Sequence, residues 1–542
     1  MTNLINKSKS LNVFFVVFII IFYINGCSST SHLEHASHQS MTNDQKNKIP
    51  YIENALGSYN WVITTDEKDA QNYFKQGMQL RWAYSINSAT LSMLEARRID
   101  PNCAMCYWGE AFALGSYLNG PMTNENSIYA REAILKASDL SINFANQIEK
   151  DLIKASIIRY PENYKMENRR ATDLLFSEEM EKLFNKYPNN HEIATVYAVS
   201  LFVLEERRAT RSLLDPNIIR IKDILTGVLD NNLKHPGACH LYIHLTESTQ
   251  DPGLALPCAE FLSESIPIAS HIQHMPSHTY NEVGMWGQSV RANIKAVHSD
   301  LMAEKNQGFS AYPSHNLHML LYSASYDGQS AIAIQAGKDY RKLTNNSMYE
   351  LSTLIRFGRF DEVINNENKP LDDMGKSLWL FSKGYSNLKL GNLSAAKTYA
   401  QEINSISNST IEFFRYDSVK ALSSTLYNIL LGEIYFDEGM WEKSLDAFGS
   451  AVMAEDSIGF NEPEALPFSA RHWLGSALLK LKMFAEAEKV YREELLDHPN
   501  NGWSLYGLKE SLKAQNKEQE QIEVQFNNSW SRSDTLIVGS KF

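Results

Sequence analysis

Histidines are concentrated in one short part of this sequence of 542 residues. Nine of the 15 lie between residues 235 and 318, where an even distribution would place about two. His240 and His244 are four residues apart, as are His274 and His278, and the second pair follows the first by 34 residues. Residues four apart lie on one face of a helix, so each pair could place two imidazoles on the same metal ion. This spacing predicts a transition-metal site.

Glu247 and His318 could complete such a site, with Glu247 acting either as a ligand or as a carboxylate that orients a ligating histidine. The predicted metal ligands are therefore His240, His244, His274, His278, His318 and Glu247. Imidazole is a good ligand for zinc, copper and iron, which are the candidate cofactors. Two other interpretations stay open. Buried histidines can be purely structural, and protonated histidines can bind a carboxylate or phosphate, because histidine titrates near neutral pH.

An internal repeat indicates which elements position these residues. Segments that begin at residues 70, 425 and 468 share a small residue at position 8 and a bulky one at position 24. The small residues are Gly77, Gly432 and Gly475, and the bulky ones are Met93, Phe448 and Tyr491. The pattern resembles the tetratricopeptide repeat, in which 34 residues form two antiparallel helices. The resemblance implies an all-α solenoid of helical hairpins, a right-handed superhelix, with an irregular section where the pattern weakens, at 123–235.

Units beginning at Pro236, Ser270 and Ser314 extend this register over the histidines. The resemblance implies that positions 2, 5, 9 and 12 of each first helix line a concave groove. Those positions hold the predicted metal ligands together with four further groove residues, which are His271, His315, Asn281 and Tyr322. Pro276 falls inside the first helix of the second unit. That helix could begin only at Pro276, which would leave His271 and His274 on the preceding turn.

The N-terminus resembles a bacterial lipoprotein signal. Lys7 and Lys9 precede a short apolar stretch at 11–24, and the sequence Ile24-Asn-Gly-Cys27 follows. The resemblance implies cleavage before Cys27 and its attachment to lipid. With Ser28 next, the implied location is the periplasmic side of the outer membrane. The alternative is an uncleaved N-terminal membrane anchor. Both interpretations place the remaining chain outside the cytoplasm.

Four cysteines remain after Cys27, and an exported chain meets conditions in which cysteines pair. Four cysteines allow three connectivities. Cys239 and Cys258 fall on opposing helices of the unit beginning at Pro236, so we predict a disulfide between them. Cys103 and Cys106 form a CxxC motif, for which a structural link or free thiols are each a better interpretation than redox activity.

The sequence divides into seven predicted segments. They are a signal peptide at 1–26, a flexible tether at 27–55, N-terminal hairpins at 56–122, an irregular helical section at 123–235, histidine-rich units at 236–343, C-terminal units at 344–515 and a polar tail at 516–542. Hydrophobic residues make up 44% of the chain and the net charge is -12. This composition argues against disorder and against a polytopic membrane protein. The negative charge also argues against binding to nucleic acid.

Three segments, 103–116, 235–244 with 274–280, and 491–508, resemble a group of exported bacterial tetratricopeptide proteins of unassigned activity. The chain has no Walker A motif, no G-x-S-x-G and no H-E-x-x-H. The first hypothesis is therefore a membrane-anchored protein that binds a protein or peptide in its concave groove. The alternative is a metalloprotein, for metal binding or metal-dependent catalysis, that uses the groove histidines.

Overall fold

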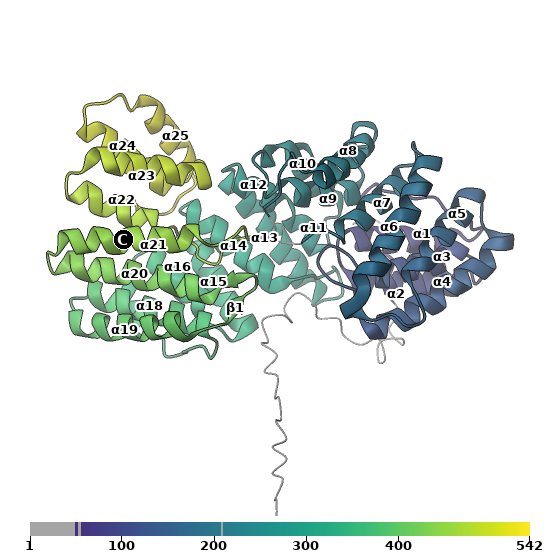
Figure 1. The fold of residues 1–542 in the computed structure, drawn as a ribbon, viewed down its shortest axis with the longest axis horizontal. Helices are drawn as coiled ribbons and strands as arrows, with labels where there is room; N and C mark the ends of the chain where they lie inside the picture. Colours follow the sequence, from purple (N-terminus) through teal and green to yellow (C-terminus); the bar gives the residue numbers. More distant parts are fainter. Residues whose placement is uncertain (1–48, 53–55, 207–209) are drawn as a thin grey trace, which may run out of the picture.

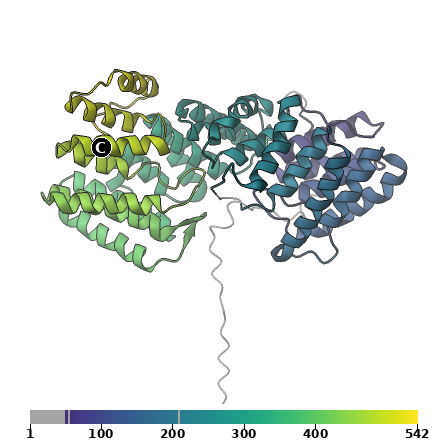
Figure 2. The same cartoon turned by 45° about the horizontal axis from the view of Figure 1, so that its top comes forward.

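The computed structural model describes residues 49–52, 56–206 and 210–542. The predicted signal peptide, Cys27 and most of the tether lie outside these residues. Helices are arranged in a curved row, with α1–α8 gathered at one end, α9–α13 in the middle and α18–α25 at the other end (Figures 1 and 2). The strands described are two residues long and form one antiparallel hairpin, β1 (Phe413–Phe414) with β2 (Asp417–Ser418). No described helix is both long enough and apolar enough to cross a membrane.

The N-terminal part contains both the first repeat and the irregular section. Its elements are α1 (Lys68–Trp82), α2 (Ile86–Ile99), α3 (Ala104–Leu114), α4 (Asn124–Phe144), α5 (Gln147–Ser156), η3 (Ile157–Arg159), η4 (Met166–Asn168), α6 (Arg169–Lys186), α7 (His191–Phe202) and α8 (Pro216–Asn231). The irregular section at 123–235 is helical, but its helices differ in length, and a long link at 203–215 separates α7 from α8.

The histidine-rich part follows the predicted register closely. Its elements are α9 (Pro236–Thr246), η5 (Pro252–Ala255), α10 (Leu256–Ser265), α11 (Ser270–His274), α12 (Pro276–Glu282), α13 (Trp286–Ala303), α14 (Pro313–Tyr326) and α15 (Ser330–Thr344). Units predicted to begin at 236, 270 and 314 therefore begin at the start of α9, of α11 and of α14.

The C-terminal part is a further series of hairpins. Its helices are α16 (Met348–Arg356), α17 (Phe360–Ile364), α18 (Asp373–Lys389), α19 (Leu393–Ser409), α20 (Val419–Asp437), α21 (Trp441–Asp456), α22 (Arg471–Lys480), α23 (Phe484–Asp497), α24 (Gly502–Ala514) and α25 (Glu520–Trp530). Each long helix packs on the next, and α14, α16, α18 and α20 also contact one another in order. The prediction of an all-α, tetratricopeptide-like solenoid with an irregular section is confirmed.

Close helix crossing explains the small residue at position 8. A Cβ atom added to Gly432 would lie 2.6 Å from the ring of Phe448, and one added to Gly475 would lie 2.5 Å from the ring of Tyr491. Phe448 and Tyr491 are the bulky residues at position 24 of the same units. A glycine on one helix thus makes room for the large side chain of its partner, as the repeat pattern predicts.

The segment at 516–542 differs from the predicted polar tail. It forms α25 and then, at 531–542, an extended strap along the solenoid. The polar contacts of this strap include Arg532 with Asp327, Ser540 with the main-chain oxygen of His472, and Lys541 with Glu433. Glu433 is at position 9 of its unit, where the repeat pattern places a groove residue. The polar side chains that suggested a loose tail are instead the ones that pair with the solenoid.

Candidate metal centre

Helix α9 is held tightly at its first turn, which directs its histidines inward. The Nδ1 atom of His235 accepts a hydrogen bond from the main-chain NH of Ala238, capping the helix, and Pro236 occupies the first helical position. A Cβ atom on Gly237 would lie 2.4 Å from the indole of Trp82, at the end of α1. Only glycine lets α9 approach α1 so closely. His235 is therefore a structural residue, and the inward face of α9 carries His240 and His244.

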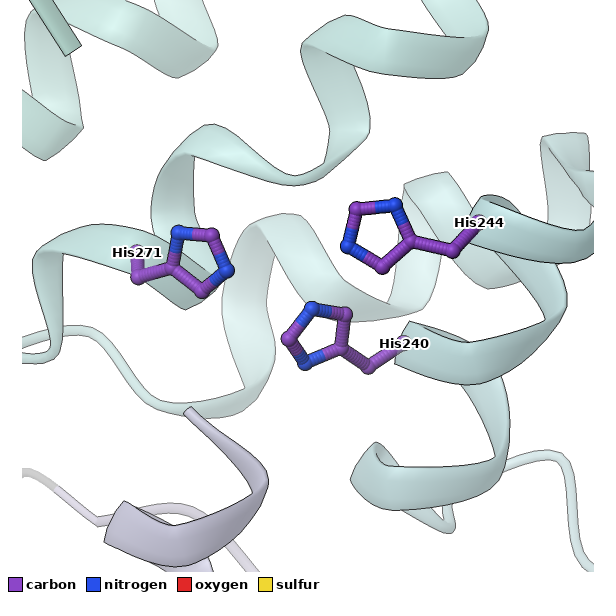
Figure 3. Close-up of side chains that lie close together, drawn as sticks. All are labelled: His240, His244 and His271. Atoms are coloured by element: carbon purple, nitrogen blue, oxygen red, sulfur yellow. The ribbon is translucent and has the colours of Figure 1, made fainter. Parts of the chain in front are cut away.

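The first group of candidate ligands consists of His240, His244 and His271. Figure 3 shows the three rings facing a common space, two of them from α9 and one from α11. One nitrogen from each ring lies within 4.8 Å of the others. The Nδ1 atom of His240 donates to the main-chain oxygen of Trp82 at 2.6 Å. In the neutral ring this leaves the lone pair on Nε2, which is the form that binds a metal.

His271 is buried among other imidazoles, with its side chain 1% exposed, and neither ring nitrogen has a hydrogen-bond partner among the described residues. Burial, and then the neighbouring His240 and His274, hold the pKa of His271 well below its usual value. The ring is therefore neutral at pH 7, with a buried lone pair directed toward two other imidazoles. A metal ion would satisfy that lone pair.

The second group consists of His274, His278 and His315, again with ligand nitrogens within 4.8 Å of one another. Met275 has helical dihedral angles, so the backbone continues helically from α11 into α12, and the two helices divide only at Pro276. His274 and His278 consequently share one face, and their Nε2 atoms lie 2.8 Å apart. Two imidazole nitrogens on a tetrahedral zinc ion are about 3.4 Å apart. If the two rings moved apart by about 0.6 Å, an ion could bind between them.

Two buried carboxylates connect the groups. Glu247 lies between the two helices, with Oε1 2.9 Å from Nδ1 of His244 and Oε2 2.7 Å from Nδ1 of His278. Oε2 of Glu462 is 2.6 Å from the same Nδ1 atom of His278. Burial opposes protonation of His278, but these carboxylates outweigh it and raise its pKa to about 9. His244, Glu247, His278 and Glu462 form a third group of candidate ligands.

Glu462 is not among the ligands predicted from the sequence. It lies in the connection between α21 and α22, where Asn461 donates to Asp417 of the β-hairpin at 2.7 Å. The guanidinium of Arg415 also donates to the main-chain oxygen of Glu462. One feature of the sequence indicates this connection: the units at 425 and 468 begin 43 residues apart instead of 34. The extra residues form the acidic connection that reaches the histidines.

Together these residues form one buried site, which we call the His/Glu cluster. Its members are His240, His244, His271, His274, His278, His315, Glu247 and Glu462, each 5% exposed or less. Each set of three histidines matches the nitrogen-rich first coordination shell of many zinc and copper sites. The carboxylates can orient histidines through Nδ1 or bind an ion directly.

Three predicted residues lie elsewhere. His318 is outside the cluster, and its prediction as a metal ligand is wrong for this arrangement: its ring stacks on Tyr349 of α16, with centroids 4.1 Å apart. From α14 it is His315 that belongs to the cluster, because the first turn of α14 faces α11 and α12, whereas the next turn faces α16. Asn281 and Tyr322, predicted as groove residues, line a small cleft beside the cluster.

Both remaining cysteine pairs are disulfides. Cys239 on α9 is linked to Cys258 on α10, and Cys103 is linked to Cys106 at the start of α3. The first bridge joins the helix that carries His240 and His244 to its hairpin partner. It therefore restrains the helix that supplies one side of the cluster.

No protein-family description and no curated protein matches this chain. Similar solved structures include human IFIT1 with capped RNA, at 12% identity over 86% of this chain and 91% of that one, with a TM-score of 0.31. The Cut9–Hcn1 assembly shows 14% identity over 85% and 90%, with a TM-score of 0.28. The P58(IPK) TPR domain shows 10% identity over 83% and 99%, with a TM-score of 0.21. At these scores the likenesses carry no argument about partners.

Proposed function

We propose that this protein binds two transition-metal ions in the His/Glu cluster, one for each set of three histidines. The observation that carries the proposal is the meeting of six imidazoles and two carboxylates in one buried place, with ligand atoms of each group within 4.8 Å. Burying polar groups costs free energy unless they are hydrogen-bonded or bound to a metal. Both nitrogens of His271 are buried without a hydrogen bond among the described residues, a cost of about 1–3 kcal/mol per nitrogen.

The donor set indicates which metals suit the site. Imidazole nitrogen favours zinc, copper and iron, whereas magnesium and calcium prefer a shell of oxygen atoms. Three histidines on each ion leave a fourth position for water or another small ligand, an arrangement typical of catalytic zinc sites. Glu247 and Glu462 lie on the Nδ1 side of His244 and His278, where they can orient these rings. We therefore propose a metalloprotein with room for a small molecule on the metal.

Elemental analysis tests the proposal. Protein produced without a histidine tag is loaded with zinc, freed of unbound metal and measured by mass spectrometry of the elements. We expect about two zinc ions per chain, and few or none after the double substitution His240→Ala plus His278→Ala, which removes one ligand from each set. His298→Ala, an exposed histidine on α13, is the matched control. A wild-type protein that retains no zinc, copper or iron would overturn the proposal.

We also propose that the chain is exported and attached to a membrane by lipid at Cys27, a proposal supported by the sequence alone. Lipid attachment would increase the mass of the N-terminal cysteine by that of its acyl groups, which intact-mass measurement detects. Cys27→Ala should move the protein from the membrane to the soluble fraction. An unmodified Cys27 within a retained N-terminus would instead support the alternative of an uncleaved anchor.

Binding of a protein or peptide in a concave groove stays a prediction. In the histidine-rich units, most of the predicted groove residues belong to the buried His/Glu cluster. In the C-terminal units, the strap at 531–542 contacts groove residues such as Glu433 and Tyr385. The chain itself therefore covers the groove in both parts. A partner bound in the C-terminal units would have to replace the strap.

A further inference from the structure

A buried metal site needs a path by which ions enter. The members of the His/Glu cluster are 5% exposed or less, so solvent does not reach them across a broad surface. A cleft with a volume of about 70 Å³ lies beside the cluster, and Glu247, His278 and Glu462 of the cluster line it. This cleft therefore connects directly with the third group of candidate ligands.

The same cleft reaches the surface. At its inner end the side chains of Glu247, His278 and Glu462 are 1%, 1% and 3% exposed. Two other lining residues, Glu464 and Asp497, have side chains that are 45% and 57% exposed. The exposure gradient shows a passage that begins at the protein surface and ends at the candidate metal ligands.

Carboxylates line this passage along its length. They are Glu464 and Asp497 at the surface, Glu282 between, and Glu247 and Glu462 at the inner end, and we call this lining the acidic cleft. Carboxylates crowded in this way repel an anion and attract a cation, whose charge would relieve their mutual repulsion.

The size of the cleft limits what can enter. A volume of 70 Å³ holds about five water molecules, too little for a peptide or a nucleotide.

Glu464, at the surface end of the cleft, has a partner that a cation can replace. Oε1 of Glu464 lies 3.2 Å from Nε2 of His498, while Nδ1 of His498 lies 2.9 Å from Glu494. A cation that arrives at Glu464 competes with His498 for this carboxylate. The imidazolium of His498 keeps its contact with Glu494.

We propose that divalent transition-metal ions reach the His/Glu cluster through the acidic cleft, with Glu464 and Asp497 as the first carboxylates they meet. The inference rests on the proposed function, because a path matters only if the cluster binds metal. It goes beyond that function in assigning a loading route and two residues that set its rate. These two carboxylates act on arrival of the ion and are not permanent ligands.

Stopped-flow loading of the metal-free full chain with cobalt(II), followed by the absorbance of the bound ion, tests the route. The double variant Glu464→Gln plus Asp497→Asn should load about tenfold more slowly at low ionic strength and reach the same final cobalt content. Added salt should slow loading of the wild type and have less effect on the variant, because screening removes the same attraction. The matched control is Glu442→Gln plus Asp446→Asn, which removes two exposed carboxylates from α21.

Each outcome decides between the possibilities. A double variant that loads as fast as the control variant overturns the route while leaving the proposed metal site in place. A lower final cobalt content would show that Glu464 or Asp497 is a permanent ligand, which also overturns the proposed role. Wild-type protein that takes up no cobalt, zinc or copper overturns both. If the double variant melts early, Asp497→Asn alone, at the most exposed position of the cleft, repeats the test.

Discussion

Saturation with zinc is expected to stabilise this protein by about 4 kcal/mol for each bound ion when free zinc is 1,000 times its dissociation constant. The reason is that the His/Glu cluster assembles ligands from α9, α11, α12, α14 and the connection after α21, and unfolding separates them. An ion that binds only the folded state therefore shifts the equilibrium toward it. Thermal unfolding of metal-free protein, with and without added zinc, measures the effect as a rise in melting temperature.

The double variant His244→Ala plus His278→Ala provides the sharpest comparison. These two residues belong to different sets of three histidines, and both also belong to the third group. We expect the rise in melting temperature with zinc to disappear in this variant and to persist in His298→Ala. Removing buried histidines also destabilises the metal-free protein, so the quantity compared is the zinc-dependent difference within each variant. An undiminished rise in the double variant would place the bound metal elsewhere.

Replacement of His271 by phenylalanine is expected to make the metal-free protein less sensitive to acid. Burial keeps the pKa of His271 in the folded protein well below 6.5, its value in the unfolded chain. Between these two pKa values the unfolded chain binds a proton that the folded chain does not. The stability that His271 contributes is therefore complete above pH 6.5 and is lost as the pH falls below it, by about 1.4 kcal/mol per pH unit.

Urea unfolding with a chelator at pH 6.5, 5.5 and 4.5 measures this difference. Because other groups titrate in the same range, the test is the free energy of unfolding of His271→Phe minus that of the wild type at each pH. This difference should rise in favour of the variant as the pH falls, and His298→Phe, at an exposed position of α13, is the matched control. Parallel pH profiles for wild type and His271→Phe would show that His271 has the same pKa in the folded and the unfolded chain, which would contradict the prediction.

Much of this architecture can be predicted from local pattern. Glycine at position 8 and a bulky residue at position 24 recur because both serve the contact within one hairpin, so the sequence of a single unit contains them. The same register correctly places His240 and His244 on one face of α9 and His274 and His278 on one face of the next helix pair. Helix faces follow from spacing, since the period of an α-helix depends only on its backbone.

Contacts between distant units could not be predicted in this way. His318 occupies the same repeat position as His240 and His274, yet it stacks on Tyr349 while His315 joins the cluster. Which of these two histidines reaches the cluster depends on the position of α14 relative to α12 and α16. The strap at 531–542 is similar: its polar composition suggested a loose tail, and only the folded solenoid supplies Glu433 and Asp327 as its partners.

The sequence by itself determined the helical repeat and the presence of several imidazoles on one face of three neighbouring helices. The tertiary structure alone decided that this face is buried, and that Glu462 reaches it from a connection about 200 residues away along the chain from Glu247 and His278. Periodicity determines the direction of a side chain within one helix. Closure of the cluster by Glu462 depends instead on the curvature of the whole solenoid, to which every helix crossing contributes.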